Sequence, residues 1–446
     1  MKENYTEYEK ILPLSPIQHG MLFHYIYHPD RTYVEQMTCR ISGDLDLHVF
    51  TQAINAVIAN RDMLRAVIVE FNSELPKQAI LRERIADIIY FDYNGIDNPS
   101  EQITKYLSND LNTPFNLTEE TYRFILFKLD YQTYIFACTY HHIIIDAWSE
   151  KIVEEEFCKA YYLLSSKSTI TKEEHPYANY LMWINDQDEE KARHYWRDYL
   201  SGLQVHRQSR TTLRQTGSYK CESFILDGEM KLLVEEAARH YKCTSNIVLL
   251  SIWGMYLIKH FQKPEVLFGC VVFGRMISLK NVSDIVGLFV NCIPIRICEQ
   301  SALYRLISEI QLHIYKSASY CYMSLSDILA CGEFRAQDIN TCVNFSIDVN
   351  TMKNKYTDKL SFVVSDMHYE EQASYSVYLD IFIESNRIRI DTYFDTTEYY
   401  FESANIKNLF EHILLVLRKC SDATVADLLH EISSTENKTN GTEFNF

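Results

Sequence analysis

The sequence predicts a mixed α/β or α+β fold that is divided into two lobes. Segments with the apolar spacing of amphipathic helices alternate with β-branched and aromatic runs typical of strands, and some of these runs follow one another as hairpins. The chain has 446 residues, of which 47% are hydrophobic. A single hydrophobic core rarely keeps growing beyond roughly 250–300 residues. We therefore expect at least two lobes, each with a core of its own.

Helices are predicted where apolar residues recur three and four positions apart, because this spacing places them on one helical face. In chain order these segments are Ser15–Tyr27, Leu47–Arg61, Ser149–Leu164, Glu189–Leu200, Glu229–Tyr241, Asn246–Phe261, Tyr304–Lys316 and Ile406–Cys420. Strands are predicted from short β-branched and aromatic runs. These runs are Ala66–Phe71, Arg123–Leu129, Thr133–Tyr140, Val266–Val272, Ile293–Ile297, Thr341–Val349, Ser376–Ile383 and Arg387–Phe394.

A domain boundary is predicted in the polar stretch Ser165–Glu174. We expect an N-terminal lobe over residues 1–174 and a C-terminal lobe over residues 175–432. Residues 433–446 are rich in Asn, Thr and Glu, and we expect them to form a tail or linker.

The composition excludes several classes of protein. A formal charge of −17 argues against a general nucleic-acid binder, which neutralises phosphates with clustered cations. None of the 12 glycines forms G-x-G-x-x-G, and the one G-x-x-x-x-G, at Gly269–Gly274, lacks the Lys of a phosphate-binding loop. ATP and nicotinamide chemistry are therefore not expected.

The cysteines and the N-terminus indicate a cytoplasmic protein. The 12 cysteines are scattered and contain no C-x-x-C pair, a pattern typical of buried, reduced thiols. The N-terminus is polar where a signal peptide would be apolar, and the longest nearly unbroken apolar run, Ile247–Ile258, is too short to span a bilayer. We expect no contact with a membrane and no bound metal.

The most informative segment is a pair of histidines between a predicted strand and a predicted helix. His141 and His142 follow Tyr140, and three isoleucines separate them from Asp146. Because successive strand side chains point to opposite faces, the two histidines should have different roles and should not converge on a metal. Both could be structural core histidines. A carboxylate held near an imidazole by an apolar bridge instead favours a desolvated polar site.

The H-H-x-x-x-D segment resembles the acyl-transfer motif of the chloramphenicol acetyltransferase-like superfamily, which includes the condensation domains of nonribosomal peptide synthetases. Four flanking regions resemble the other condensation-domain motifs: Leu14–His24, Asn60–Arg65, Tyr177–Trp183 with Tyr195–Trp196, and Gly287–Arg296. Asp62 stands where the family usually has Glu, and Cys292 where it often has Thr. The resemblance extends from about Leu12 to Leu429.

The resemblance implies two acetyltransferase-like lobes in a V-shaped pseudodimer with a central tunnel. A donor carrier protein (thiolation domain) would present an acyl thioester on its phosphopantetheine arm, and an acceptor carrier protein or a free amine would supply the attacking group. The product is an amide of secondary metabolism, the donor is expected to be of the L type, the chain is expected to be a monomer, and no cofactor is expected on the chain itself. In this picture His142 is the active-site histidine and His141 packs away from the tunnel.

The same resemblance implies an ion pair for Asp146. In the family this aspartate is a structural ion-pair partner and not a catalytic base, and its partner here is expected to be Arg275, with Arg65 as a second candidate. Breaking a buried pair of this kind typically costs about 3–5 kcal/mol. Loss of Asp146 should therefore resemble misfolding.

Four further residues belong to the expected site. Ala147 stands where the family usually has Gly, and its methyl group would restrict the backbone there. Trp148 either lines the tunnel or anchors the next helix, and the anchor is favoured. Ser149 is expected to be the N-cap of that helix. Asn291 either reaches the tunnel or holds a loop.

Elementary energetics limit what His142 contributes. A thioester is already activated, and holding it beside an amine lowers the barrier by roughly 7–11 kcal/mol. A general base adds about 10²–10⁴-fold in rate. His142 could act as the base, orient the amine or stabilise the tetrahedral intermediate, and the sequence does not choose among them.

Two alternatives remain open. One is a non-catalytic docking or recruitment domain with the condensation fold, although such domains usually have a degraded motif and His142 and Asp146 are intact. The other is a free-standing acyltransferase that makes an amide or ester with a free acceptor. The chain contains no adenylation motif and no carrier-protein segment, so we expect at least the donor to arrive from another polypeptide.

Overall fold

The computed structural model describes residues 7–27, 31–71, 73–172, 175–203, 219–346, 355–371, 375–395, 403–417 and 423–440. The chain forms two compact units. Unit 1 comprises Met1–Gln187, Arg275–Val290 and Val349–Gln372, and unit 2 comprises Asp188–Gly274, Asn291–Asp348 and Ala373–Phe446. The mixed α/β class expected from the sequence is confirmed.

The two units differ from the predicted lobes, which divide the chain after residue 174. Residue 174 itself lies outside the described residues. Residues 175–187 belong to unit 1, and so do two segments from much later in the chain. The physical reason is that β12 (Phe362–Glu370) pairs with β2 (Val34–Gly43) and so completes a sheet of unit 1. The later segment Arg275–Val290 joins unit 1 through hydrogen bonds described below.

The main sheet of unit 1 has five strands in the order β12-β2-β7-β6-β5. The remaining strands are β5 (Ile88–Asp92), β6 (Tyr122–Lys128) and β7 (Thr133–His141). The predicted strands Arg123–Leu129 and Thr133–Tyr140 form a hairpin, since β6 and β7 are antiparallel neighbours. A smaller sheet has the order β1-β4-β3, formed by β1 (Tyr8–Pro13), β3 (Ala66–Val69) and β4 (Lys77–Leu81).

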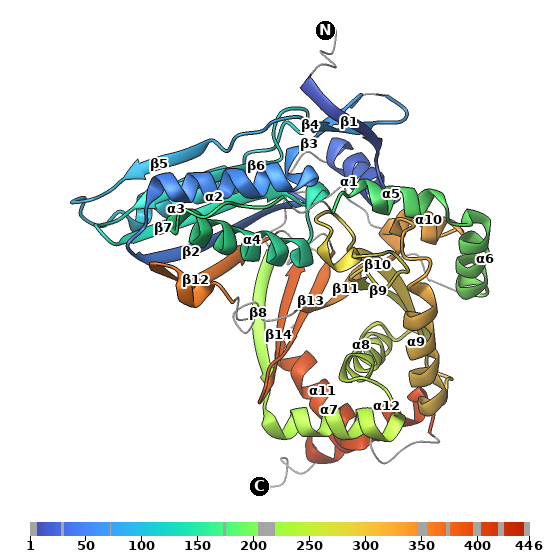
Figure 1. The fold of residues 1–446 in the computed structure, drawn as a ribbon. Coiled ribbons are helices and arrows are strands. Elements are labelled where there is room, and N and C mark those ends of the chain that lie inside the picture. The colour runs from blue at the N-terminus through green and yellow to red at the C-terminus, as the bar shows by residue number, and fades with distance from the viewer. Residues whose placement is uncertain are drawn as a thin grey trace. The chain divides into compact units, whose positions relative to one another are not determined.

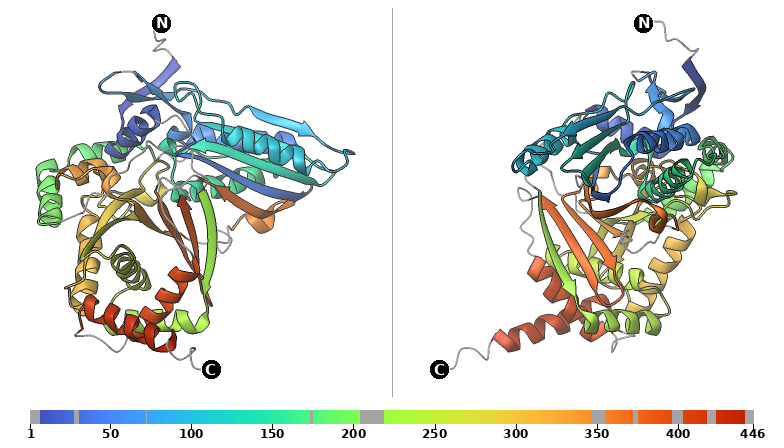
Figure 2. Two further views of the ribbon diagram at one scale, coloured as in Figure 1. Left: turned by 180° about the vertical axis from the view of Figure 1, so that it is seen from behind. Right: turned by 60° about the vertical axis from the view of Figure 1, so that its left-hand side comes forward.

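Helices cover both faces of the main sheet. Figure 1 shows α2 (Leu47–Asn60) and α4 (Ala147–Ser165) on the near face, and the reverse view in Figure 2 shows α3 (Ser100–Leu111) on the opposite face. Alternate residues of β7 divide accordingly. Phe136 packs into the core of α2 and α4, whereas Ala137 packs with Ile103 of α3. The helices α1 (Pro16–Tyr27) and α5 (Ala178–Asn185) complete the unit.

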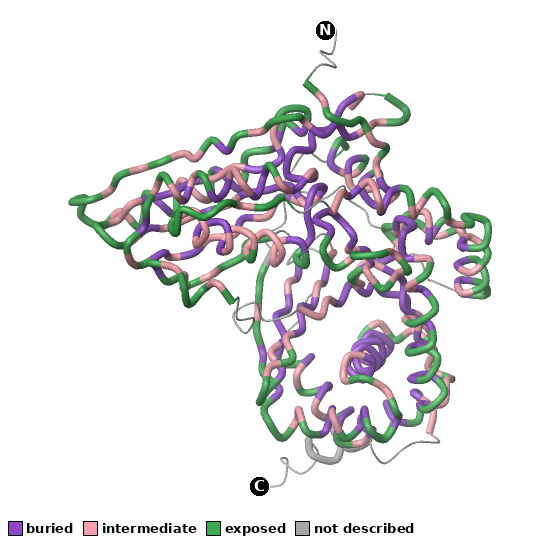
Figure 3. Tube along the Cα trace, viewed as in Figure 1, coloured by how far each residue is buried: buried purple, intermediate pink, exposed green. Residues whose placement is uncertain are grey.

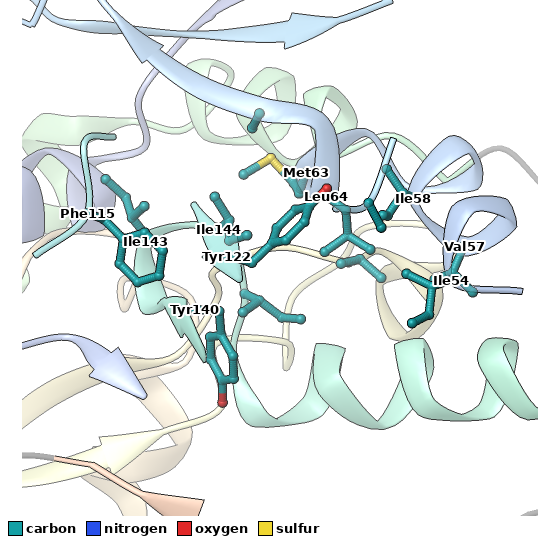
Figure 4. Packing of buried hydrophobic residues seen from close by; sticks show 14 of the residues in the cluster. Ile54, Val57, Ile58, Met63, Leu64, Phe115, Tyr122, Tyr140, Ile143 and Ile144 are labelled. Atoms are coloured by element: carbon teal, nitrogen blue, oxygen red, sulfur yellow. The ribbon is translucent and has the colours of Figure 1, made fainter. Parts of the chain in front are cut away.

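The core of unit 1 extends to the histidine motif. Figure 4 shows side chains of α2, such as Ile54 and Ile58, in one cluster with Ile143 and Ile144. Both motif isoleucines are at most 2% exposed. The apolar bridge between the histidines and Asp146 is therefore part of the core.

Unit 2 is built on a six-stranded sheet in the order β10-β9-β11-β13-β14-β8. Its strands are β8 (Tyr219–Leu226), β9 (Glu265–Val272), β10 (Asn291–Cys298), β11 (Thr341–Ser346), β13 (Val377–Ile383) and β14 (Ile388–Asp395). Its helices are α6 (Glu189–Leu200), α7 (Gly228–Tyr241), α8 (Ser245–Phe261), α9 (Leu303–Ser317), α10 (Leu325–Ala330), α11 (Ser403–Leu417) and α12 (Val425–Asn440). The last residues of the predictions Thr341–Val349 and Ile406–Cys420 lie outside the described residues.

The helix α8 explains the long apolar run in the sequence. All residues from Ile247 to Ile258 are buried, and Figure 3 shows α8 as a buried tube inside unit 2. The run is therefore a core helix. Within the part of the chain that the structure describes, no helix is long and apolar enough to cross a membrane.

The predicted tail is partly helical. Helix α12 continues through residues 433–440 and ends at Asn440. Residues 441–446 lie outside the described residues.

Candidate active site

The histidine motif forms the turn between β7 and α4. His141 is the last residue of β7, His142–Ile144 form a short 3-10 helix, and α4 begins at Ala147. The turn is fixed by backbone and side-chain hydrogen bonds. The His142 N–H donates to the Tyr33 carbonyl at 2.8 Å, and the Gln18 amide donates to the Ile143 carbonyl at 2.9 Å.

His141 lies in the core of unit 1. Its side chain is fully buried, its Nδ1 accepts the Ile143 N–H at 3.1 Å, and the ring of Tyr25 packs edge-on at a centroid distance of 4.7 Å. Burial, and then the charge of His142, lower the pKa of His141 to about 3. His141 is therefore a neutral structural residue at ordinary pH.

His142 lies against a carboxylate. Its Nε2 is 3.3 Å from Oε1 of Glu35, and its side chain is 20% exposed. Burial alone lowers the pKa of His142. The nearby charges of Glu35, Asp146 and Glu150 and its own backbone carbonyl outweigh this effect, so the pKa lies above its ordinary value. The protonated form of the imidazole is thus favoured relative to an ordinary histidine.

Tyr140 and Glu150 lie next to the contact between His142 and Glu35. The Tyr140 hydroxyl is 2.5 Å from Oε2 of Glu35 and also contacts Oε1 of Glu150. Glu35 and Tyr140 are direct neighbours on β2 and β7, and Glu150 comes from the first turn of α4. Burial, followed by the charge of Glu35, raises the pKa of Glu150 to about 8. His142 therefore contacts Glu35, which is hydrogen-bonded through Tyr140 to Glu150, and these three groups come from β2, β7 and α4.

Asp146 connects α4 to the segment Arg275–Val290. Its Oδ1 accepts the Ser149 N–H at 2.8 Å, and its Oδ2 accepts the backbone N–H groups of Phe289 at 2.9 Å and of Val290 at 3.3 Å. Asp146 is 2% exposed. These bonds occupy both oxygens, so the carboxylate is held as a structural anion and not as a free base.

Of the two expected partners of Asp146, Arg275 makes the contact. Its Nη2 lies 3.0 Å from Oδ1 of Asp146, and its Nη1 donates to the Val282 and Ile285 carbonyls, both at 2.8 Å. Arg65 pairs instead with another carboxylate, Glu9, at 2.8 Å. The Arg65 alternative is therefore wrong.

Ser149 is not the N-cap of the helix. The N-cap is Asp146, whose backbone is extended (φ −121°, ψ 168°) and whose carboxylate accepts the Ser149 N–H. The Ser149 hydroxyl is used elsewhere: it donates to the Gly287 carbonyl at 2.9 Å, accepts the Gly287 N–H at 3.0 Å and accepts from Arg275 at 2.7 Å. Ser149 therefore joins α4 to the segment Arg275–Val290.

The other expected site residues have structural contacts. Ala147 is the exposed first residue of α4. The Trp148 indole N–H donates to the Ser283 carbonyl at 3.0 Å, so the residue anchors the start of α4. The Asn291 amide, in unit 2, donates to the Cys321 and Met323 carbonyls at 2.7 and 2.6 Å. Of the two alternatives for Asn291, the structure has the held loop.

Residues of the flanking motifs also form hydrogen bonds and close contacts with the segment Arg275–Val290. Arg61 forms an ion pair with Glu156 of α4 and donates to the Asp284 carbonyl at 2.8 Å. The Tyr177 hydroxyl donates to the Leu288 carbonyl at 2.7 Å. A Cβ atom at Gly287 would lie 2.2 Å from a ring carbon of Tyr177. The glycine is therefore required by this close approach.

Sequence reasoning missed Glu35, Tyr140 and Glu150. The signal for Tyr140 was its place beside the motif, and for Glu150 its place one turn into α4. Glu35 carries no local signal, because its contact with His142 depends on the pairing of β2 with β7. Among the residues that the structure describes, no group of three or more metal-ligating side chains is assembled.

The fold and the histidine turn together define a family. Residues 8–439 match the model of the condensation domain, and the chain belongs to this family.

Two of its relatives are bacitracin synthase 3 and bacitracin synthase 1 of Bacillus licheniformis, with 30% identity over 431 residues and 29% over 443 residues. These alignments cover 94% and 95% of this chain but only 7% and 8% of the synthases. The chain thus spans less than a tenth of the length of these relatives.

Solved structures show the same fold. The condensation enzyme VibH has a TM-score of 0.71 at 17% identity, with 92% of this chain and 99% of that one covered. The starter condensation domain of rhizomide synthetase has a TM-score of 0.73 at 16% identity, with 94% and 98% covered. A four-domain nonribosomal peptide synthetase has a TM-score of 0.74 at 16% identity, with 94% and 34% covered.

Proposed function

We propose that this chain forms an amide bond in nonribosomal peptide synthesis. An amine acceptor attacks an acyl or peptidyl thioester that a donor carrier protein holds on its phosphopantetheine arm. The observation that carries the proposal is an intact histidine motif in a condensation-family chain, with His142 directly after β7 and Asp146 fully engaged with Arg275 and the backbone.

The reaction forms a C–N bond and breaks the C–S bond of the thioester. The amine loses a proton and the departing thiolate gains one, so no net proton is consumed. Juxtaposition of the two substrates supplies roughly 7–11 kcal/mol of barrier lowering, and His142 supplies a further factor of about 10²–10⁴ in rate. His142 receives or directs the amine proton through its Nε2, which its 20% exposed side chain leaves partly accessible.

The proposal includes the remaining expectations from the sequence. The donor is of the L type, and the acceptor arrives on a second carrier protein or as a free amine. The phosphopantetheine arms belong to the substrates. The protein acts as a monomer in the cytoplasm.

The test compares the parent chain with His142→Ala in the presence of a loaded donor carrier protein and a loaded acceptor or candidate amines. Mass spectrometry measures the new amide. His142→Ala should lose at least about 10²-fold in amide formation while its melting temperature stays close to that of the parent. A matched control is His48→Ala, because His48 is an exposed histidine of α2.

Near-normal turnover in His142→Ala would contradict the role of His142. If the parent chain binds the carrier proteins but gives no product with any acceptor class, the chain is a docking domain of the condensation fold. Product with a free amine or alcohol, but not with a carrier-bound acceptor, would identify a free-standing acyltransferase.

A further inference from the structure

The Nε2 nitrogen of His142 faces a carboxylate that the proposed reaction does not require. Glu35 Oε1 lies 3.3 Å from Nε2, and the Glu35 side chain is only 14% exposed. A carboxylate oxygen only accepts hydrogen bonds when ionised, so the contact is favourable when Nε2 carries a proton. In this geometry Glu35 is the partner of an Nε2 atom that carries a proton.

The second oxygen of Glu35 belongs to a shared hydrogen bond. The Tyr140 hydroxyl contacts both Glu35 Oε2 and Glu150 Oε1, but one hydroxyl has one proton to donate. If Tyr140 donates to Glu35, then Glu150 must carry a proton and donate to the Tyr140 oxygen. The raised pKa of Glu150, about 8, agrees with this assignment. Glu35 Oε2 then accepts a hydrogen bond from Tyr140, while Oε1 lies 3.3 Å from Nε2 of His142.

Four elements around His142 contribute titratable groups that bear on its charge. From β2 come Glu35 and Cys39, from β7 Cys138, Tyr140 and His141, from α4 Asp146, Glu150 and Glu154, and from β12 Tyr369. These groups are acidic or neutral, since His141 is held neutral by burial. The surroundings therefore favour a positive charge on His142, and Glu35 is the carboxylate in contact with it.

We propose that Glu35 is a positioning residue for His142. It fixes the direction of Nε2 and, supported by Tyr140 and Glu150, keeps a proton on that nitrogen in the resting protein. The active form of His142 is the neutral one, whose Nε2 accepts the amine proton, so Glu35 also sets the pH above which the site works. The effect on rate rests on the proposed function, whereas the effect on His142 itself does not.

Two readouts test this inference. The first is an NMR titration of the imidazole of His142 in the full chain, and the second is the pH profile of kcat/KM for amide formation. In Glu35→Gln both midpoints should move to lower pH by about one unit, since an opposite charge at this distance shifts a titration by about 1–3 units. Glu35→Asp keeps the charge but shortens the reach, so its midpoint should stay nearer that of the parent while kcat falls.

The matched control is Glu155→Gln. It removes an exposed carboxylate from the same helix as Glu150, and Glu155 is not one of the groups named around His142. Both midpoints should match those of the parent chain. A merely structural role for Glu35 would change stability and leave the midpoints in place.

Unchanged midpoints in a folded Glu35→Gln variant would overturn the inference. If that variant does not fold, the titration of the parent chain decides, because a His142 midpoint at or below the ordinary value of about 6.5 contradicts the proposed pairing. If the parent chain forms no amide, the proposed function fails, while the NMR midpoints still decide the role of Glu35.

Discussion

The guanidinium of Arg275 lies 3.0 Å from the carboxylate of Asp146, although 129 positions separate the two residues in the chain. Their side chains are 6% and 3% exposed. Arg275 also stacks on the ring of Phe289 at 3.9 Å. The pair therefore closes the segment Arg275–Val290 over the start of α4.

Removal of one charge from this pair should be severe. In Asp146→Asn the Arg275 guanidinium stays buried without a counter-charge, and we expect a loss of about 3–5 kcal/mol in the free energy of unfolding. Urea denaturation measures it. In the double variant with Arg275→Met the loss should be smaller than the sum of the single losses, and full additivity would contradict a direct pair.

Ser149→Ala should destabilise the protein to a smaller extent. The variant leaves the Gly287 N–H and the Gly287 carbonyl without their partner, which typically costs about 1–3 kcal/mol. Thermal denaturation by circular dichroism measures the change. Ser308→Ala is the control, because Ser308 is exposed and bonds only within its own helix; equal losses in both variants would contradict the role assigned to Ser149.

Gly287→Ala should strain unit 1. The added methyl group would lie 2.2 Å from the Tyr177 ring, so the ring or the backbone must move. Overpacking of this kind typically costs about 1–3 kcal/mol. The unfolding free energy of Gly287→Ala is compared with that of Gly228→Ala, where the nearest atom to the new methyl is 3.1 Å away. A neutral Gly287→Ala would show that the Tyr177 contact is loose.

Buried His141 should make the protein sensitive to acid. Its folded-state pKa of about 3 lies below the ordinary histidine value of 6.5, so the unfolded state binds the proton more readily. Stability from this group is present above pH 6.5 and is lost as the pH falls from there towards about 3. The full difference corresponds to at most about 5 kcal/mol.

Denaturation curves at several pH values measure this loss. In His141→Asn the slope of unfolding free energy against pH should become shallower over that range. The exposed His48 provides the control variant, His48→Asn, whose slope should follow that of the parent. An unchanged slope in His141→Asn would show that other groups dominate the acid sensitivity.

Elements with a strong local pattern were predictable from the sequence. The helix Glu189–Leu200 was predicted with the bounds that the structure gives it. The apolar residues that indicate this helix all lie within the segment itself, so no distant partner is needed to recognise it. The strand β2 was missed, since VEQMTCRISG has no β-branched run. Its extended form depends on pairing with β7 on one edge and with β12 on the other, and both partners are far away in the sequence.

In the site, too, local features were predictable and long-range contacts were not. The place of His142 after a strand was readable, because the strand and the following helix are local features. The choice of N-cap was not, since Asp146 and Ser149 both belong to residue types that cap helices. The hydroxyl of Ser149 is taken by Gly287, 138 positions away, and no local rule contains that partner.

The composition of unit 1 from three separate stretches has a consequence for synthesis of the chain. During translation, residues 1–187 emerge before Arg275 and long before β12, so they must wait for more than half of the following chain before their sheet and their ion pair can be completed. A fragment cut after residue 187 would expose the β2 edge and leave the Asp146 carboxylate without its cation. Unit 1 is therefore compact in space but discontinuous in sequence. It can be completed only after its last stretch, Val349–Gln372, has left the ribosome.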